Sequence, residues 1–470
     1  MNYKILTSEE VDGIWGQLEE FKTSPYLHQK ISILFGLDKP NIGYFHDVGT
    51  GKTIIAIYLA IIKDYKRVLV VCPNSVKYNW MKEIQKHSDK SCMVLEGSTE
   101  EKLAKIKSDH WAHITNYESL RWIFANGTRK IDMKRMKEYG DFDILILDEL
   151  HKVKNYKSQQ SRIALELSKK IKNTIGLTGT PIGNSLLDLF NQMRVLDLGK
   201  TFGNTFWRYR KAFFDEKPGW FASDWIPHED AEERISDAMK DIVIRYSKSE
   251  CLDLPERIYE TREIEISGDQ RKVVDAFTAD FETYLQGKKI EVNGALARAM
   301  KITQAVDGFV LNDGKAIFFD TNPKLEELVN IVNEINGKVV IVHRFVAEGK
   351  FIQARLKKEG YKTRALRGEI KDKNKELIEF QNDPDIKAIV INPQSGGIGI
   401  DLYQASTMIF FSNSYSYLER HQCEGRIHRS GQKNTCLYID LLGRDTLDEE
   451  VYEIIMNKKS LSDRILGRIK

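Results

Sequence analysis

A glycine-rich turn between a short apolar strand and an apolar helix constrains the fold of this chain most strongly. The segment 41–45 predicts a strand, Gly49-Thr50-Gly51-Lys52-Thr53 follows it, and the apolar run 54–62 predicts a helix. Glycines let backbone N–H groups approach phosphates, and a helix N-terminus favours negative charge. Lys52 is expected to neutralise β/γ-phosphate charge and Thr53 to place its hydroxyl on Mg²⁺. A strict phosphate loop has glycine where this chain has His46, so the match is to the shorter Gly-x-Gly-Lys-Thr pattern.

An acidic strand end is the natural complement of such a loop. The buried-strand pattern 142–147 runs directly into Asp148 and Glu149. Asp148 is expected to hold Mg²⁺, and Glu149 to orient or deprotonate the attacking water. Taken alone, two carboxylates could equally cap the next helix. Together with the lysine loop, they favour nucleotide hydrolysis.

Apolar strands and helical stretches alternate along both halves of the chain. This rhythm predicts an α/β fold with doubly wound parallel sheets. The second series has no phosphate loop of its own. Strands are expected at 68–72, 113–115 and 174–178 in the first half, and at 338–342, 387–391 and 408–411 in the second.

Three polar side chains in the second half are expected to serve the triphosphate. On a helix, Gln422, Arg426 and Arg429 would share one face. Guanidinium groups stabilise charge in phosphoryl transfer. The plainer interpretation is a solvated basic face. A further loop, Ser395-Gly396-Gly397, could approach a phosphate backbone, although such loops are often simple tight turns.

Composition narrows the classes of protein without naming a partner. The net charge is +3, from 71 basic and 68 acidic residues, so charge alone does not predict nucleic-acid binding. The five cysteines are scattered, which makes a zinc site or disulfide framework improbable. The longest apolar run is too short to cross a bilayer, and the N-terminus has no signal core. We therefore expect a cytoplasmic protein, neither secreted nor bound to membrane.

Several further segments resemble, in order, the motifs of superfamily-two helicases, specifically the Swi/Snf-type group of DNA translocases. In the first half, Leu27-His28-Gln29 resembles the adenine-reading motif, which places Gln29 on the base. The resemblance implies that Thr178, Gly179 and Thr180 couple hydrolysis to movement. It also implies that nucleic acid contacts two strand ends. Their residues are Pro73, Asn74, Ser75, Thr115 and Asn116.

The second half continues the resemblance as far as about residue 442. The segment 250–256 resembles the inter-lobe signature, and 425–432 resembles the closing arginine motif. Nucleic-acid contacts are implied there as well. Their residues are His343, Arg344, Arg367, Gly368, Ser395, Gly396 and Gly397. The chain departs from the group in one segment and at two single positions. Residues 47–50 replace the usual acidic-Met-Gly-Leu segment, Asp401 replaces asparagine and Gly425 replaces aspartate.

The resemblance implies two RecA-like lobes with helical insertions between them. We expect an N-terminal extension (1–20), an ATP-binding lobe (21–198), helical protrusions (199–318), a second lobe (319–446) and a closing helix (447–470). Aromatic residues within 199–265 could stack on bases, but we favour a role in the core of a helical subdomain. We find no inserted hairpin or aromatic wedge in the second lobe.

The predicted function is a DNA-stimulated ATPase that uses ATP and Mg²⁺ to move along duplex or branched DNA. Forks and junctions would be remodelled, in repair, recombination or replication, and long blunt duplexes separated poorly. An RNA helicase and a nucleotide-gated binding module with vestigial hydrolysis are the alternatives. The compact chain suggests a prokaryotic or phage source, and its protein partners are unknown.

Overall fold

The computed structural model describes residues 7–16, 18, 21–128, 130–217, 224–286, 292–370, 372–393 and 400–469. By its internal contacts the chain divides into two units. The first unit contains residues 1–252 and 460–470, and the second contains residues 253–459. None of the described helices is long and apolar enough to cross a membrane. The domain boundaries expected from the sequence stay predictions.

The first unit is built on a seven-stranded sheet whose pairings are all parallel, in the order β3-β4-β2-β5-β6-β1-β9. Its central strands are almost continuously apolar because both faces are covered, as is typical of parallel sheets. The strands are β1 (Asn41–Tyr44), β2 (Val68–Cys72), β3 (Cys92–Val94), β4 (Ala112–Asn116), β5 (Ile144–Asp148), β6 (Thr174–Leu177) and β9 (Val243–Ile244).

Helices alternate with these strands. They are α1 (Ser8–Trp15), α2 (Leu27–Gly36), α3 (Lys52–Ile62), α4 (Lys77–His87), α5 (Thr99–Ile106), α6 (Leu120–Phe124), α7 (Met133–Tyr139), α8 (Gln159–Ile171), α9 (Leu189–Asp197), α10 (Phe206–Phe213), α11 (Ala231–Met239) and α12 (Lys248–Cys251). Short 3₁₀ turns are η2 (Asn74–Val76), η3 (Tyr117–Ser119), η4 (Leu150–Val153) and η5 (Leu186–Asp188). An antiparallel hairpin joins β7 (Phe214–Lys217) to β8 (Asp224–Pro227).

The second unit contains a six-stranded parallel sheet in the order β10-β17-β16-β13-β15-β14. Its strands are β10 (Arg257–Ile264), β13 (Lys338–Val342), β14 (Lys362–Leu366), β15 (Ile386–Ile391), β16 (Ala405–Phe410) and β17 (Cys436–Gly443). Its helices are α13 (Gly268–Gln286), α14 (Val292–Val306), α15 (Pro323–Glu334), α16 (Val346–Lys358), α17 (Lys373–Asn382), α18 (Tyr417–Ile427) and α19 (Leu447–Arg468). The last residues of α19 belong to the first unit.

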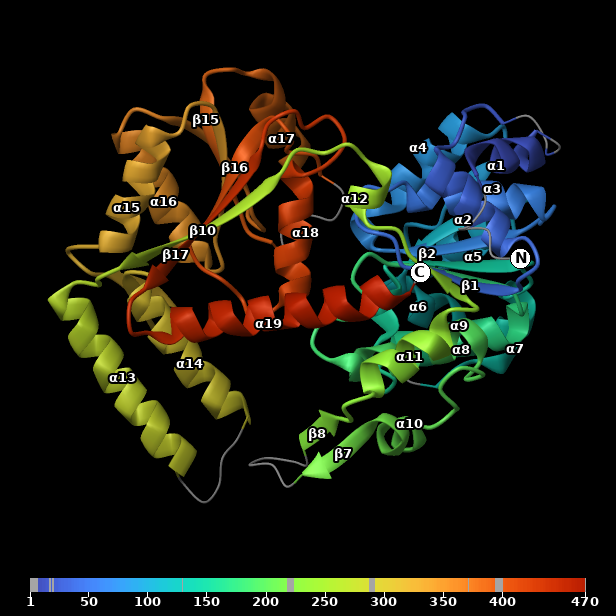
Figure 1. Ribbon diagram of the computed structural model, residues 1–470, viewed down its shortest axis with the longest axis horizontal. Helices are drawn as coiled ribbons and strands as arrows, with labels where there is room; N and C mark the ends of the chain where they lie inside the picture. The colour runs from blue at the N-terminus through green and yellow to red at the C-terminus, as the bar shows by residue number, and fades with distance from the viewer. Residues whose placement is uncertain are drawn as a thin grey trace. The chain divides into compact units, whose positions relative to one another are not determined.

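The predicted fold class, two doubly wound parallel-sheet lobes, is confirmed. The segment expected to hold helical protrusions is more varied. It contains the paired helices α13 and α14 (Figure 1), but also the hairpin β7–β8 and a second hairpin of β11 (Phe309–Asn312) and β12 (Lys315–Phe318). That second hairpin lies in the second unit but ends before residue 319, so it falls in the segment expected between the lobes. The described strands of 319–446 all belong to the parallel sheet.

The aromatic residues of 199–265 are mainly core residues, as we favoured. Phe202, Tyr209 and Phe214 are buried in the core of the first unit, and Tyr209 packs against Phe190 with 5.6 Å between ring centroids. Trp207 is the exception among the described members, because 60% of it is exposed. Trp220 lies outside the described residues.

Candidate ATP site and nucleic-acid surfaces

Three neighbouring strand ends carry the predicted nucleotide residues. The acid pair follows β5, the coupling segment follows β6 and the phosphate loop follows β1. Because the strands are parallel, their carboxyl ends lie at one edge of the sheet, where open α/β sheets bind ligands. The sheet order therefore brings together three segments that are far apart in the sequence.

The phosphate loop needs its second glycine for both conformation and space. Gly51 has a φ of +82°, in the left-handed region, and directly precedes α3. A Cβ at this position would lie 2.2 Å from Nε2 of Gln29. Any larger residue would therefore be strained and would also collide with α2.

Lys52 occupies the first position of α3 and reaches back over the loop. Its ammonium donates to the carbonyl oxygens of His46 and Asp47 at 2.8 and 3.0 Å. Burial lowers the pKa of Lys52, while the carboxylates of Glu149, Asp148 and Asp47 act in the opposite direction. The cation is thus already positioned between the loop and the acid pair.

His46 stands where the strict phosphate-loop pattern has glycine, and its side chain has a structural role. Its side chain is completely buried, and its Nδ1 accepts a hydrogen bond from the backbone N–H of Tyr246 at 3.1 Å. In the neutral ring Nε2 then carries the proton and donates to Ser32 Oγ at 2.9 Å. The imidazole therefore ties the loop to α2 and to the segment after β9, a role that glycine could not perform.

The side chains of Gln29 and His28 on α2 form hydrogen bonds to the phosphate loop. Both side chains donate to the carbonyl oxygen of Thr50, at 3.1 and 2.9 Å respectively. The Oε1 atom of Gln29 accepts from the N–H of Tyr26 at 2.9 Å, and only 4% of Gln29 is exposed. The adenine-reading role of Gln29 stays a prediction. The hydrogen bonds of Gln29 hold the phosphate loop in place against α2.

Asp148 is the last residue of β5, and both of its carboxylate oxygens have partners. Oδ1 accepts from the N–H of Glu149 at 3.0 Å, and Oδ2 accepts from the indole N–H of Trp80 at 2.8 Å. Burial and the neighbouring Glu149 raise the pKa of Asp148 to about 6. The Trp80 contact was not foreseen from the sequence.

Glu149 has a different environment from its neighbour. Its backbone is left-handed, with a φ of 54°, and its carboxylate lies 3.2 Å from Nδ1 of His151. Burial would raise the pKa of Glu149, but the hydrogen bond and charge of His151, with Lys52, lower it overall. Glu149 is therefore the carboxylate of the pair that ionises more readily.

The coupling segment contacts both the loop and the acid pair. Nδ1 of His151 lies 3.3 Å from Thr178 Oγ1, which also accepts from the N–H of Thr180 at 3.2 Å. A Cβ on Gly179 would lie 3.1 Å from the backbone nitrogen of Val48, so this segment packs closely on the loop. His151 is therefore shared between Glu149 and Thr178.

The residues present fit a magnesium–nucleotide complex. The hydroxyl of Thr53, in the first turn of α3, and the carboxylate of Asp148 are oxygen donors of the kind that Mg²⁺ prefers. Gly51 has a left-handed backbone and no side chain, as expected in a loop whose backbone N–H groups approach phosphates.

In the second unit, a buried ion cluster positions α18. Arg420 contacts Asp440 at 2.5 Å and Glu424 at 2.7 Å, and all three side chains are almost fully buried. The hydroxyl of Tyr259 on β10 donates to Glu424 at 2.9 Å. This cluster fixes the helix that carries Gln422 and Arg426. Sequence reasoning missed it, although an arginine and a glutamate spaced i, i+4 were visible.

The prediction that Gln422, Arg426 and Arg429 share one helical face is wrong for Arg429. Helix α18 ends at Ile427, and the chain turns at Gly431, whose φ is +99°. The side chain of Gln432 donates to the carbonyl of Ile427 at 3.2 Å and so closes the end of the helix. Arg429 therefore lies in the turn after α18.

The two arginines have different surroundings. Arg426 is buried. Arg429 forms an ion pair with Asp401, one of the departures from the family pattern, and burial lowers its pKa. Arg429, which is predicted to stabilise charge on the triphosphate, is therefore paired with a carboxylate in this structure.

The predicted nucleic-acid residues of the first unit differ in accessibility. Asn74 and Ser75 are exposed just beyond β2, whereas Pro73 and Thr115 are buried. Asn116 is buried too, and its amide is held by Glu118 at 2.7 Å and Ser119 at 2.6 Å. The exposed Asn74–Ser75 turn is the more accessible of the two strand ends.

In the second unit the corresponding residues follow three neighbouring strands. His343 and Arg344 follow β13, and Arg367 and Gly368 follow β14. His343 is completely buried, while Gly368 is exposed. The loop of Ser395, Gly396 and Gly397 follows β15 and lies outside the described residues.

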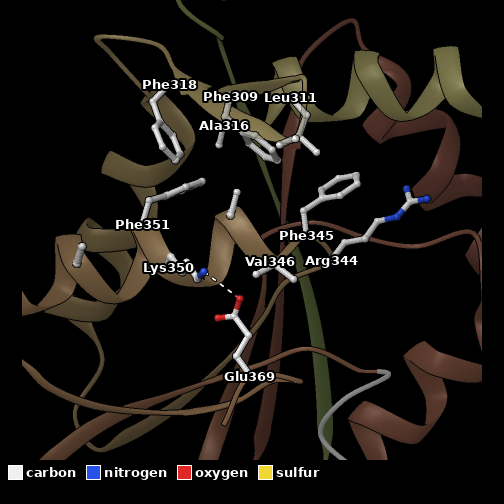
Figure 2. Close-up of a pocket in the computed structure, with 13 residues that line it drawn as sticks. Phe309, Leu311, Ala316, Phe318, Arg344, Phe345, Val346, Lys350, Phe351 and Glu369 are labelled. Carbon is white, nitrogen blue, oxygen red and sulfur yellow. Dashed lines mark hydrogen bonds and ion pairs between the residues drawn. The ribbon is translucent and has the colours of Figure 1, made fainter.

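Arg344 also borders an apolar cavity of about 900 Å³ (Figure 2). Figure 2 shows the hairpin β11–β12 on one side, with Phe309 and Phe318, and α16 on the other, with Phe351. Lys350 and Glu369, 2.9 Å apart, supply the charges at its border. The hairpin thus places exposed apolar side chains beside a predicted nucleic-acid residue.

Two family profiles match the chain. That of the SNF2-related domain matches residues 36–307, and that of the helicase conserved C-terminal domain matches residues 323–431. The chain belongs to the SNF2-related family. The predicted Swi/Snf-type superfamily-two helicase is confirmed, and with it an enzyme of the ATP-dependent helicase class.

Relatives of this SNF2-family chain are phage, bacterial and animal proteins. Protein p41 of Acyrthosiphon pisum secondary endosymbiont phage 1 is 25% identical over 96% of this chain and 100% of its own length. The ATP-dependent helicase/translocase YwqA of Bacillus subtilis is 24% identical over 89% of this chain. The Caenorhabditis elegans homolog of SWI/SNF-related regulator of chromatin subfamily A-like protein 1 is 25% identical over 94% of this chain.

The chain spans only part of the last two relatives, 46% of YwqA and 61% of the nematode protein. Among solved structures, the Sulfolobus solfataricus SWI2/SNF2 ATPase core in complex with dsDNA is 24% identical, over 96% of this chain and 95% of that chain, with a TM-score of 0.44. The fold assignment rests on the two parallel sheets themselves.

Proposed function

We propose that this SNF2-family chain hydrolyses ATP to move along duplex or branched DNA, remodelling forks and junctions or displacing bound proteins. The contact of His151 with both Glu149 and Thr178 carries the proposal. It joins a predicted hydrolytic carboxylate to the segment predicted to drive movement. A module that only binds nucleotide has no movement to couple to hydrolysis, so it would not need this contact of His151.

Each site residue has a distinct proposed task. Lys52 offsets the negative charge of the β/γ-phosphates, and Thr53 and Asp148 would hold Mg²⁺, which supplies further charge neutralisation when bound. Glu149, whose pKa is lowered, is the base that orients water and accepts its proton. Arg426 and Arg429 would stabilise the charge of the transferring phosphoryl group.

The choice of DNA follows from the relatives. The Mus musculus relative is named a chromodomain-helicase-DNA-binding protein, and YwqA is named a helicase/translocase. Contacts to phosphates carry little base-sequence information, so binding should depend little on sequence and weaken steeply with salt. A motor that grips phosphates can follow a duplex without opening it.

The deciding experiment compares ATP turnover on duplex DNA, forked DNA, single-stranded DNA and RNA at equal nucleotide concentration and one fixed salt. Duplex or forked DNA should stimulate turnover strongly and RNA poorly. Lys52→Ala serves as the control for contaminating ATPase. If RNA stimulates as well as DNA, the chain is an RNA helicase instead.

Strand separation is a second, separate readout. The expectation that long blunt duplexes are separated poorly rests on a second lobe (319–446) without an inserted hairpin, and the hairpin β11–β12 lies directly before that lobe. Since β11–β12 presents exposed Ile317 and Phe318, fork regression and blunt-duplex unwinding should be measured side by side. We expect regression to be the faster. Equal rates would mean that the motor is a strand-separating helicase.

A further inference from the structure

Asp148 receives two hydrogen bonds from residues outside the acid pair. The indole N–H of Trp80 donates to Oδ2 of the carboxylate at 2.8 Å. The phenol of Tyr117 donates to the backbone carbonyl of the same residue at 2.8 Å. Both donors are almost fully buried. Side chain and main chain of Asp148 are therefore each held from the same side of the sheet.

Both donors follow strands on that side, Trp80 in α4 after β2 and Tyr117 in η3 after β4. The sheet order is β4-β2-β5, and Val71 of β2 pairs with Leu147 of β5, which sets Cys72 beside Asp148. Trp80 is the fourth residue of α4, the helix that begins two residues after the exposed Asn74–Ser75 turn. Helical side chains lean toward the helix N-terminus, which directs the indole back to the carboxyl end of the sheet.

The hydrogen bond of Trp80 is not explained by core packing alone. Trp111 is a buried tryptophan of the same unit, and its indole N–H donates to a backbone carbonyl, that of Tyr65, at 2.8 Å. Trp80 instead donates to a buried carboxylate, a charge-assisted bond that is stronger and more directional. Residues that hold a metal ligand in this way tune its affinity for the metal.

We propose that Trp80 is a positioning residue that transmits contact of DNA with the Asn74–Ser75 turn to the carboxylate of Asp148, while Tyr117 fixes the main chain beneath it. This inference rests on the proposed function for the DNA contact. A small shift of α4 when the turn is occupied would move the indole and re-aim Oδ2. Rigid packed elements carry such sub-ångström shifts. Nucleic acid would thereby set how well the ATP site holds Mg²⁺.

The test uses Trp80→Phe and the milder Tyr117→Phe, each in the full chain. Their matched controls are Trp111→Phe and Tyr209→Phe. Tyr209 is likewise buried, and its hydroxyl donates to the carbonyl of Leu186 at 2.8 Å. Without DNA, the Mg²⁺ concentration for half-maximal binding of a fluorescent ATP analogue should rise by roughly 10–100-fold in Trp80→Phe. It should rise less in Tyr117→Phe and stay unchanged in both controls.

A second measurement follows the response to DNA. At saturating duplex DNA and a Mg²⁺ concentration near the wild-type half-maximal value, the ratio of stimulated to basal turnover should fall in Trp80→Phe. The Kd for DNA, measured without Mg²⁺ and nucleotide, should stay at the wild-type value. A wild-type ratio in Trp80→Phe overturns the inference, whatever happens to Mg²⁺ binding. Equal losses in Trp111→Phe overturn it as well. If the wild-type chain itself is not stimulated by DNA, the proposed function fails together with the inference. A stimulated wild type with an unchanged Trp80→Phe ratio removes the inference alone.

Discussion

Lys52 and Glu149 have different proposed tasks in ATP hydrolysis, and their substitutions should be distinguishable. Lys52→Ala should weaken ATP binding and abolish turnover, because it removes the cation that meets the β/γ-phosphates. Glu149→Gln should keep ATP bound with little turnover, since only water activation is lost. Nucleotide binding by equilibrium titration and phosphate release by a coupled assay separate the two effects. Wild-type turnover in Glu149→Gln would contradict the role of that carboxylate.

Arg429 offers a second prediction at this scale because of its pairing with Asp401. Arg429→Ala should lower turnover by ~10³-fold while nucleotide affinity hardly changes, as for other arginine fingers. Asp401→Asn removes the carboxylate that holds the guanidinium and should raise basal turnover. The double variant should behave like Arg429→Ala. If Asp401→Asn raises turnover equally in the absence of Arg429, the ion pair is not the cause.

The site residues whose positions the sequence specifies most directly are those with a fixed local spacing. Lys52 and Thr53 are defined by the glycines before them, and Asp148 and Glu149 by the strand before them. Their supporting side chains could not be predicted in the same way. Trp80 and His46 act across strands that are distant in sequence, and only the sheet order brings their partners close. Periodicity places a residue on a strand, but it does not say which strand lies beside it.

At the scale of elements, the apolar central strands were predicted closely, including β2 and β13 with their bounds. Buried parallel strands are continuous apolar runs, which makes them easy to detect. The hairpin β11–β12 was missed despite a clear signal. Asp313-Gly314 lies between two apolar segments, the pattern typical of a two-residue hairpin turn. This turn lies far in the sequence from any recognised motif, which is why the hairpin was not predicted.

The turn of this hairpin gives a prediction on stability. Asp313 and Gly314 have φ values of 48° and 77°, and Asn312 pairs with Lys315 across them. Gly314→Ala has open space around it but would force an alanine into the left-handed region, at a cost of roughly 1–2 kcal/mol in the free energy of unfolding. Gly268→Ala is the matched control, because Gly268 also has open space around it but, unlike Gly314, does not have a positive φ. Denaturant unfolding followed by circular dichroism measures both. Equal stabilities would show that the turn is not strained.

At the scale of the whole molecule, the path of the chain between units is the main feature. It leaves the first unit after residue 252 and returns with residues 460–470. Ile465, Leu466 and Ile469 are buried in the core of the first unit, and Arg464 pairs with Glu232 at 2.9 Å. A fragment that ends between the lobes would therefore lack part of its own core, which no motif in the sequence indicates.

A pair of substitutions on α19 tests this return. Ile465→Ala should lower the free energy of unfolding by about 2–5 kcal/mol, because it removes a fully buried side chain from the core of the first unit. Ile454→Ala lies on the same helix but is 38% exposed, so its effect should be much smaller. The melting of ATP-analogue binding, a property of the first unit, should shift with Ile465→Ala. If the melting temperature of ATP-analogue binding does not change, α19 does not stabilise the first unit.

The returning segment also fixes an order of events during synthesis. A ribosome must make the entire second unit before it releases the residues that complete the core of the first. The nascent phosphate loop therefore exists for most of translation in a lobe whose hydrophobic surface is still partly uncovered. A chain interrupted late in translation should therefore be recognised by proteases through that uncovered surface.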